Sequence, residues 1–235
     1  MSYHEEIDRL IYCETELEYS DFKLVVNINK NKNHHIKTLV PADKKFQDGY
    51  KAIINFFNEI HWFHDVKISG ISSGCHNEYM LSFHYEANKD EYLVRSFKQR
   101  IFKEEQHKAL AYYREGNSIG SCYYNFLCLY KILEMPFKDS RDLGNWIDAK
   151  IANIDDSLLT ISAKRIKQKA EDDSSKAKYI REKIRHYLSH GKNMGIESID
   201  YNDFDCWDEV KWINLLLDYL VKDILITKLE LPLKI

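Results

Sequence analysis

The chain has 235 residues, 44% of them hydrophobic, which suffices for one large domain or for two smaller domains with real cores. The formal net charge of −3, from 34 basic and 37 acidic residues, excludes a protein that binds nucleic acid with its whole surface. No apolar run is long enough to span a bilayer, and the acidic N-terminus does not resemble a signal peptide, so we expect a cytoplasmic protein without a membrane partner. The five cysteines lack the paired short spacings of zinc sites, which predicts free buried thiols.

The first part of the chain alternates apolar and polar residues in the manner of half-buried strands. Between two predicted hairpins, apolar residues recur every three or four positions over residues 46–60, which predicts one amphipathic helix. We therefore predict a small N-terminal α+β domain at residues 1–88, with residues 72–77 as the second hairpin turn. Its predicted antiparallel strands are residues 22–28, 36–40, 66–71 and 79–85.

After residue 88 the alternation stops and helical patterns take over, which predicts an all-α helical bundle at residues 89–235. The whole chain is thus expected to be of the α+β class, with an antiparallel-strand and helix domain followed by a helical bundle. The predicted helices are residues 91–114, broken by Gly116-Asn117; residues 118–135, ended by Pro136; a short helix at 146–154; a basic helix between the capping residues 172–175 and Gly191; and a long C-terminal helix at about 210–224.

Residues 185–190 of the basic helix, Arg-His-Tyr-Leu-Ser-His, place a permanent cation and a titratable imidazole beside a helix end. Cleavage of RNA by its own 2′-hydroxyl needs a general acid or base and a cation for the charge that develops on phosphorus. His190 suits the first role, and the planar guanidinium of Arg185 suits the second because it grips two phosphate oxygens. Five residues apart, the two side chains stand about 140° from each other around an ideal helix and share no stripe.

The surroundings of this motif are locally basic. Residues 164–192 contain ten lysines and arginines against four acidic residues. Arg181 lies one turn before Arg185 and is expected to share its face as a second phosphate contact. We also expect RNA contacts from Lys178, Lys183 and Lys192, and an ordinary solvated helix face is the alternative.

The motif resembles the signature of HEPN-domain ribonucleases, which here consists of Arg185, the polar His186 and the following His190. A second stretch, residues 126–134, resembles the early helix of the Apea-like and MauJ-like branches of that family. The resemblance covers about residues 91–229. It implies a metal-independent endoribonuclease that leaves 2′,3′-cyclic phosphates and acts as a toxin or antiviral defence effector. It also implies a homodimer in which both copies of Arg185 and His190 line one composite cleft, with His186 orienting the scissile phosphate or a water. The N-terminal domain would then restrain the enzyme or recognise a trigger or inhibitor partner.

Other interpretations stay open. The same fold without catalysis would be a dimeric module that binds RNA, a nucleotide or a protein. A purely structural reading pairs Arg185 with Glu182 and makes His190 a polar cap of the helix end. His186 and His190 have a spacing at which two imidazoles share a metal, but no third ligand is evident, so we expect neither metal nor cofactor.

Overall fold

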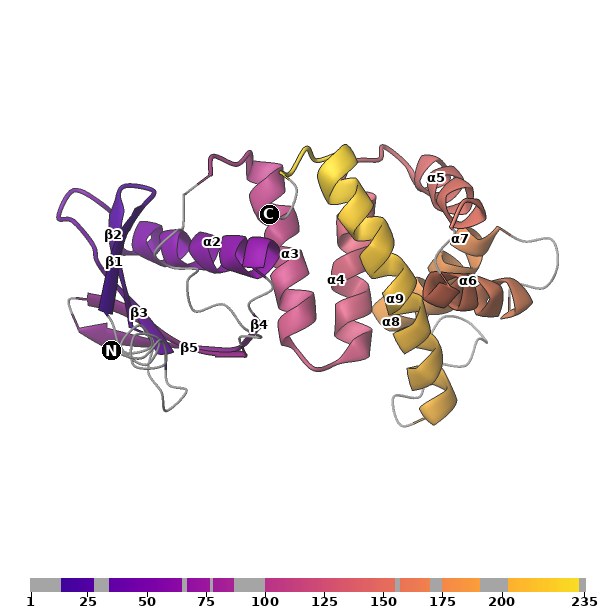
Figure 1. Ribbon diagram of the computed structural model, residues 1–235, viewed down its shortest axis with the longest axis horizontal. Coiled ribbons are helices and arrows are strands. Elements are labelled where there is room, and N and C mark those ends of the chain that lie inside the picture. Colours follow the sequence, from indigo (N-terminus) through magenta and orange to yellow (C-terminus); the bar gives the residue numbers. More distant parts are fainter. Residues whose placement is uncertain are drawn as a thin grey trace, which may run out of the picture. The chain divides into compact units, whose positions relative to one another are not determined.

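A computed structural model of the chain describes residues 14–27, 34–64, 67–76, 78–86, 100–154, 157–169, 175–190 and 203–232 (Figure 1). Contacts divide the chain into two compact units, and the division falls between Arg114 and Glu115, within helix α3 (Glu104–Ser118). The expected boundary after residue 88 lies outside the described residues. Arg114, at the end of the first unit, donates a hydrogen bond of 2.7 Å from its Nε to the Oδ1 of Asn58 in the same unit.

The first unit contains a five-stranded antiparallel sheet in the order β1-β2-β3-β5-β4. All four predicted strands are confirmed, as is the pairing of the last two with each other. The expected turn at residues 72–77 is wrong in extent, because the strand before it continues to His76. The strands are β1 (Glu14–Tyr19), β2 (Phe22–Asn27), β3 (His34–Leu39), β4 (Lys67–His76) and β5 (Glu78–Glu86).

Strand β1 is the strand that the sequence did not reveal. It pairs with β2 through a tight turn in which Ser20 and Asp21 both have positive φ, at 49° and 64°. Hairpin turns of this kind usually carry Asn-Gly or Asp-Gly, because glycine adopts positive φ without strain. Ser-Asp therefore carried no hairpin signal, and the glutamates of β1 lower its strand propensity.

Helix α2 (Phe46–His64) covers the sheet and confirms the predicted amphipathic helix. Its Ile53, Phe56 and Phe57 are buried with apolar residues of the strands, among them Leu24 and Ile36. Each of these side chains is nearly or completely inaccessible to solvent, so together they form the core of the first unit.

Helix α3 differs from the prediction at both ends. It begins at Glu104, after the Lys103 amide donates a 2.7 Å hydrogen bond to the Oε1 of Gln106, and it continues through Gly116 to Ser118. Residues 91–99 of the predicted helix lie outside the described residues. Gly116 does not end the helix because its role is close packing: a Cβ added there would lie 2.9 Å from the Cβ of Cys128 on the next helix.

The second unit is a helical bundle, and the predicted α+β class with a C-terminal bundle is confirmed. The helix before Pro136 starts after Ser121, whose hydroxyl accepts a hydrogen bond from the Tyr124 amide. The predicted short helix is longer than expected, and the helix at 157–169 was not predicted. The helices are α4 (Cys122–Glu134), α5 (Ser140–Ala152), α6 (Ser157–Lys169), α7 (Lys176–Tyr179), the π-helical turn η1 (Ile180–Arg185), α8 (His186–His190) and α9 (Phe204–Thr227).

Helices α4 and α9 pack side by side and form the centre of the bundle (Figure 1). Phe126, Leu129 and Ile132 of α4 are buried, as is the predicted apolar face of α9 from Val210 to Ile224. None of the helices in the described part combines the length and the apolar character needed to cross a bilayer.

A buried carboxyl in the first unit makes its stability depend on pH. Glu59 of α2 is fully buried and accepts a hydrogen bond from the Tyr19 hydroxyl. Burial raises the pKa of Glu59 from about 4.5 to about 7, although the hydrogen bond from Tyr19 acts in the opposite direction. The folded chain thus retains a proton that the unfolded chain loses between these two values.

We therefore predict that the free energy of unfolding falls as the pH rises from about 4.5 to about 7, by up to about 3 kcal/mol. Urea denaturation across this range measures the effect, and Glu59→Gln should flatten it because glutamine does not titrate. Glu16→Gln, at an exposed position, is the matched control and should leave the pH dependence unchanged. Equal pH dependence in the wild type and in Glu59→Gln would contradict the assignment.

Candidate functional site

The predicted basic helix is confirmed as one continuous helix from Lys176 to His190 with a π-helical turn in its middle. Ser175, one of the predicted capping residues, accepts a 3.0 Å hydrogen bond from the Lys178 amide. At the end of the π-helical turn the His186 amide donates to the Arg181 carbonyl, five residues earlier. Such turns inside α-helices are frequent at functional sites. We refer to residues 176–190 as the motif helix.

The motif helix is held in the bundle by an apolar stripe. Ala177, Ile180, Ile184 and Leu188 are buried. Arg181 and Arg185 follow Ile180 and Ile184 directly, and both are half-buried at the edge of the stripe. The structure thus brings Arg181 and Arg185 to one side of the helix, as the sequence predicted.

Arg185 has a different acidic partner from the one that the sequence suggested. Its Nη2 lies 3.5 Å from the Oε1 of Glu134, at the end of α4, with 30% of the arginine side chain and 43% of the glutamate side chain exposed. Glu182, the expected partner, instead accepts a 3.1 Å hydrogen bond from Arg181. The alternative interpretation that pairs Arg185 with Glu182 is therefore wrong, because Arg185 pairs with Glu134 on another helix.

Tyr130 lies one turn before Glu134 on α4 and was not identified from the sequence. Its side chain is buried, and burial together with the Glu134 carboxylate raises the pKa of Tyr130 to about 12. The positive charges of Arg181 and Arg185 act in the opposite direction, which shows that both lie within electrostatic reach of the phenol. At neutral pH the hydroxyl is protonated and can donate a hydrogen bond.

The histidines of the motif are described to different extents. His186 is half-buried at the start of α8. His190 is the last residue of that helix, and its side chain, like Lys192, lies outside the described residues. The predicted cap at Gly191 lies outside the described residues.

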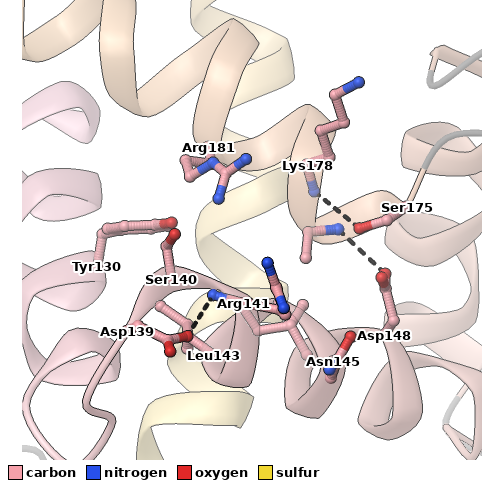
Figure 2. A pocket seen from close by; sticks show the side chains of 13 residues that line it. Tyr130, Asp139, Ser140, Arg141, Leu143, Asn145, Asp148, Ser175, Lys178 and Arg181 are labelled. Carbon is pink, nitrogen blue, oxygen red and sulfur yellow. Dashed lines mark hydrogen bonds between the residues drawn. The ribbon is translucent and has the colours of Figure 1, made fainter.

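A pocket of about 670 Å³ lies between the motif helix and α5 (Figure 2). It brings together Lys178 and Arg181, two of the predicted RNA contacts, with Arg141 of α5, which the sequence did not reveal. Lys183 is exposed on the motif helix and is not among the lining residues. Arg141 was missed because only tertiary packing brings α5 to this helix, where the Asp148 carboxylate accepts a 3.1 Å hydrogen bond from the Ala177 amide.

Metal ligands do not gather anywhere in the part of the chain that the structure describes: no three or more histidine, cysteine, aspartate or glutamate side chains are grouped closely enough to hold an ion. Cys122, Cys128 and Cys206 form no disulfide within the described residues, but the predicted burial is wrong for Cys122 and Cys206, which are half-buried. Of these three, Cys128 is buried, and burial raises the pKa of its thiol.

Comparison with known proteins gives a family match for the helical part of the chain. No curated protein and no solved structure matches it. A family model described as methylamine utilization protein MauJ matches residues 109–225, from the middle of α3 to near the end of α9. This stretch contains the motif helix, Glu134 and Arg141, and it agrees with the MauJ-like resemblance expected from residues 126–134. The helical part of this chain is similar to the MauJ family.

Proposed function

We propose that this protein is a metal-independent endoribonuclease that works in the cytoplasm, of the HEPN type, with its active site on the motif helix. The observation that carries the proposal is the pair Arg181 and Arg185, half-buried on one side of a helix that ends in His190 and borders a polar pocket. The match of this region to the MauJ family supports it as well.

Each motif residue has a role in the proposed reaction. A base removes the proton of the 2′-hydroxyl, the 2′-oxygen forms a bond to phosphorus, and the 5′-oxygen leaves with a proton from an acid. His190 provides one of these proton transfers, and His186 orients the scissile phosphate or a water. Arg185 stabilises the negative charge that develops on the phosphoryl oxygens. The products are a 2′,3′-cyclic phosphate and a 5′-hydroxyl.

The proposed active form is a homodimer. Arg185 and His190 do not share a stripe of the motif helix, so one copy alone presents them in different directions. Two copies related by a twofold axis bring both pairs of side chains to a common cleft. The first unit would restrain this site or recognise a trigger, and the biological role would be that of a toxin or antiviral defence effector.

The ion pair between Arg185 and Glu134 is compatible with phosphate binding because it is weak. At 3.5 Å and with both side chains partly exposed, such a pair contributes about 0–1 kcal/mol. A phosphate group accepts two parallel hydrogen bonds from one guanidinium, which is a stronger interaction. Bound RNA would thus displace Glu134, whose carboxylate holds Arg185 in place until then.

A second candidate function is a non-catalytic module of the same fold that binds RNA, a nucleotide or a protein partner. It is favoured by the acidic partners of both arginines, Glu182 for Arg181 and Glu134 for Arg185. In such a module these ion pairs would be structural, and binding would use the exposed lysines of the helix.

The proposal predicts that the purified protein cleaves total RNA in the presence of EDTA and leaves cyclic phosphate ends. Arg185→Ala and His190→Ala should each reduce the rate by about a hundredfold or more. The matched control is Arg165→Ala, because Arg165 also pairs with a carboxylate, that of Asp208 at 2.8 Å, but lies on α6. Full activity in either motif variant would contradict the proposal, and binding without cleavage in the wild type would favour the second candidate.

Neutralising Glu134 distinguishes a phosphate-binding Arg185 from a structural one. If Glu134 competes with RNA for the guanidinium, Glu134→Gln should raise the affinity for RNA by roughly two- to fivefold, the equivalent of a weak surface ion pair. Asp208→Asn, which releases Arg165 in the same way, should leave the affinity unchanged. Fluorescence anisotropy with a labelled RNA measures both, and lower affinity in Glu134→Gln would indicate that the ion pair is structural.

A further inference from the structure

The pocket between α5 and the motif helix has an unusual set of charges. Arg141 of α5, Lys178 and Arg181 line it, so three cations come together from segments about forty residues apart in the chain. Figure 2 shows Arg181 on one side of the pocket and Arg141 on the other, whereas the Lys178 side chain extends away from both. Three like charges around one space are unfavourable unless an anion balances them.

Within the described ranges no ion pair joins Arg141 or Lys178 to an acidic side chain, although the charge of Arg141 acts on the nearby Asp139 carboxyl; Arg181 has Glu182 at 3.1 Å. Both Arg141 and Lys178 are exposed to solvent. Their guanidinium and ammonium groups are therefore available to a ligand that enters from solution.

Two carboxylates also line the pocket, but both are occupied by backbone amides. Asp139 caps α5 by accepting hydrogen bonds of 2.8 and 2.9 Å from the amides of Arg141 and Asp142, and these bonds lower the pKa of its carboxyl. Asp148 accepts a hydrogen bond from the Ala177 amide and so connects α5 to the motif helix. These hydrogen bonds hold α5 and the motif helix in position around the pocket. The lining residues comprise three cationic and two anionic side chains, which leaves one positive charge in excess.

Neutral hydrogen-bonding groups complete the lining. Ser140, Asn145, Ser175 and Tyr130 contribute hydroxyl or amide groups, and the Tyr130 hydroxyl is protonated at neutral pH. A volume of about 670 Å³ exceeds that of a single phosphate ion and is typical of pockets for small organic ligands.

We propose that this pocket binds the phosphate group of an organic phosphate, held between the guanidinium groups of Arg141 and Arg181. Guanidinium groups suit this ligand because their planar donors match the spacing of phosphate oxygens. The phosphate belongs either to a free nucleotide or to an RNA strand that passes the motif helix. A site for a free nucleotide goes beyond the proposed cleavage, whereas a subsite for the RNA strand deepens the proposed function and rests on it.

Calorimetric titration of the full-length protein tests the proposal with three probes: adenosine monophosphate, adenosine as its uncharged analogue, and a short RNA. At least one phosphate-bearing probe should bind, adenosine should not, and Arg141→Gln should weaken the binding by roughly tenfold or more. Arg165→Gln, the same change outside the pocket, is the matched control. Arg181→Gln provides a second variant and should weaken binding in the same direction.

The arms of this experiment separate the two sources of the phosphate. Binding of the mononucleotide identifies a nucleotide site, whereas binding of RNA alone identifies a subsite for the RNA strand; either result with a loss in Arg141→Gln supports the proposal. Unchanged affinity in Arg141→Gln, or no binding of any phosphate-bearing probe at about millimolar concentration, would overturn it. If the proposed cleavage fails, no cleavage product forms although phosphate binding is intact. This outcome is therefore distinguishable from a failure of the phosphate-binding proposal.

Discussion

The site depends on one constraint, the burial of the apolar stripe of the motif helix across its π-helical turn. Ile180 and Ile184 are buried, and the burial of each contributes on the order of 2 kcal/mol. Because Arg181 and Arg185 directly follow these isoleucines, burying the stripe fixes both arginines at its edge, half-covered and directed toward α4 and α5. A rotation of the helix that released the arginines would also expose the isoleucines.

The same packing explains why charged groups from three helices meet there. The motif helix supplies Arg181 and Arg185, α4 supplies Glu134 and α5 supplies Arg141. The carboxylates in this region accept hydrogen bonds from backbone amides or pair weakly with arginine, so the positive charges remain available to an anion. Both proposals, RNA cleavage on the motif helix and phosphate binding beside it, follow from this excess of available cations.

Local signals predicted much of the fold, and long-range contacts account for the differences. Alternating residues predicted four strands, and Pro136 and Ser175 marked helix ends correctly. Strand β1 was not predicted because its turn has Ser-Asp where glycine is usual. The C-terminal end of α3 was predicted too early because Gly116 packs closely against α4 and does not end the helix. At the candidate site, the spacing of four residues predicted that Arg181 and Arg185 share one side of the helix.

Partners across helices were not predictable in this way. The pairing of Arg185 with Glu134 joins residues about fifty positions apart, and Arg141 reaches the pocket only because α5 packs on the motif helix. A sequence pattern identifies residues that are neighbours along one helix, such as Glu182 and Arg185. It does not identify an ion-pair partner that tertiary packing brings from another helix.

The central claim is that Arg185 and His190 from two copies act in one cleft, and mixing inactive variants tests it most directly. Arg185→Ala and His190→Ala protein would be co-refolded or co-expressed so that mixed dimers form, and RNA cleavage in EDTA would be compared with that of each variant alone. Activity should return in the mixture, because a mixed dimer contains one intact Arg185 opposite one intact His190. A mixture that stays inactive although mixed dimers are present would contradict the composite site.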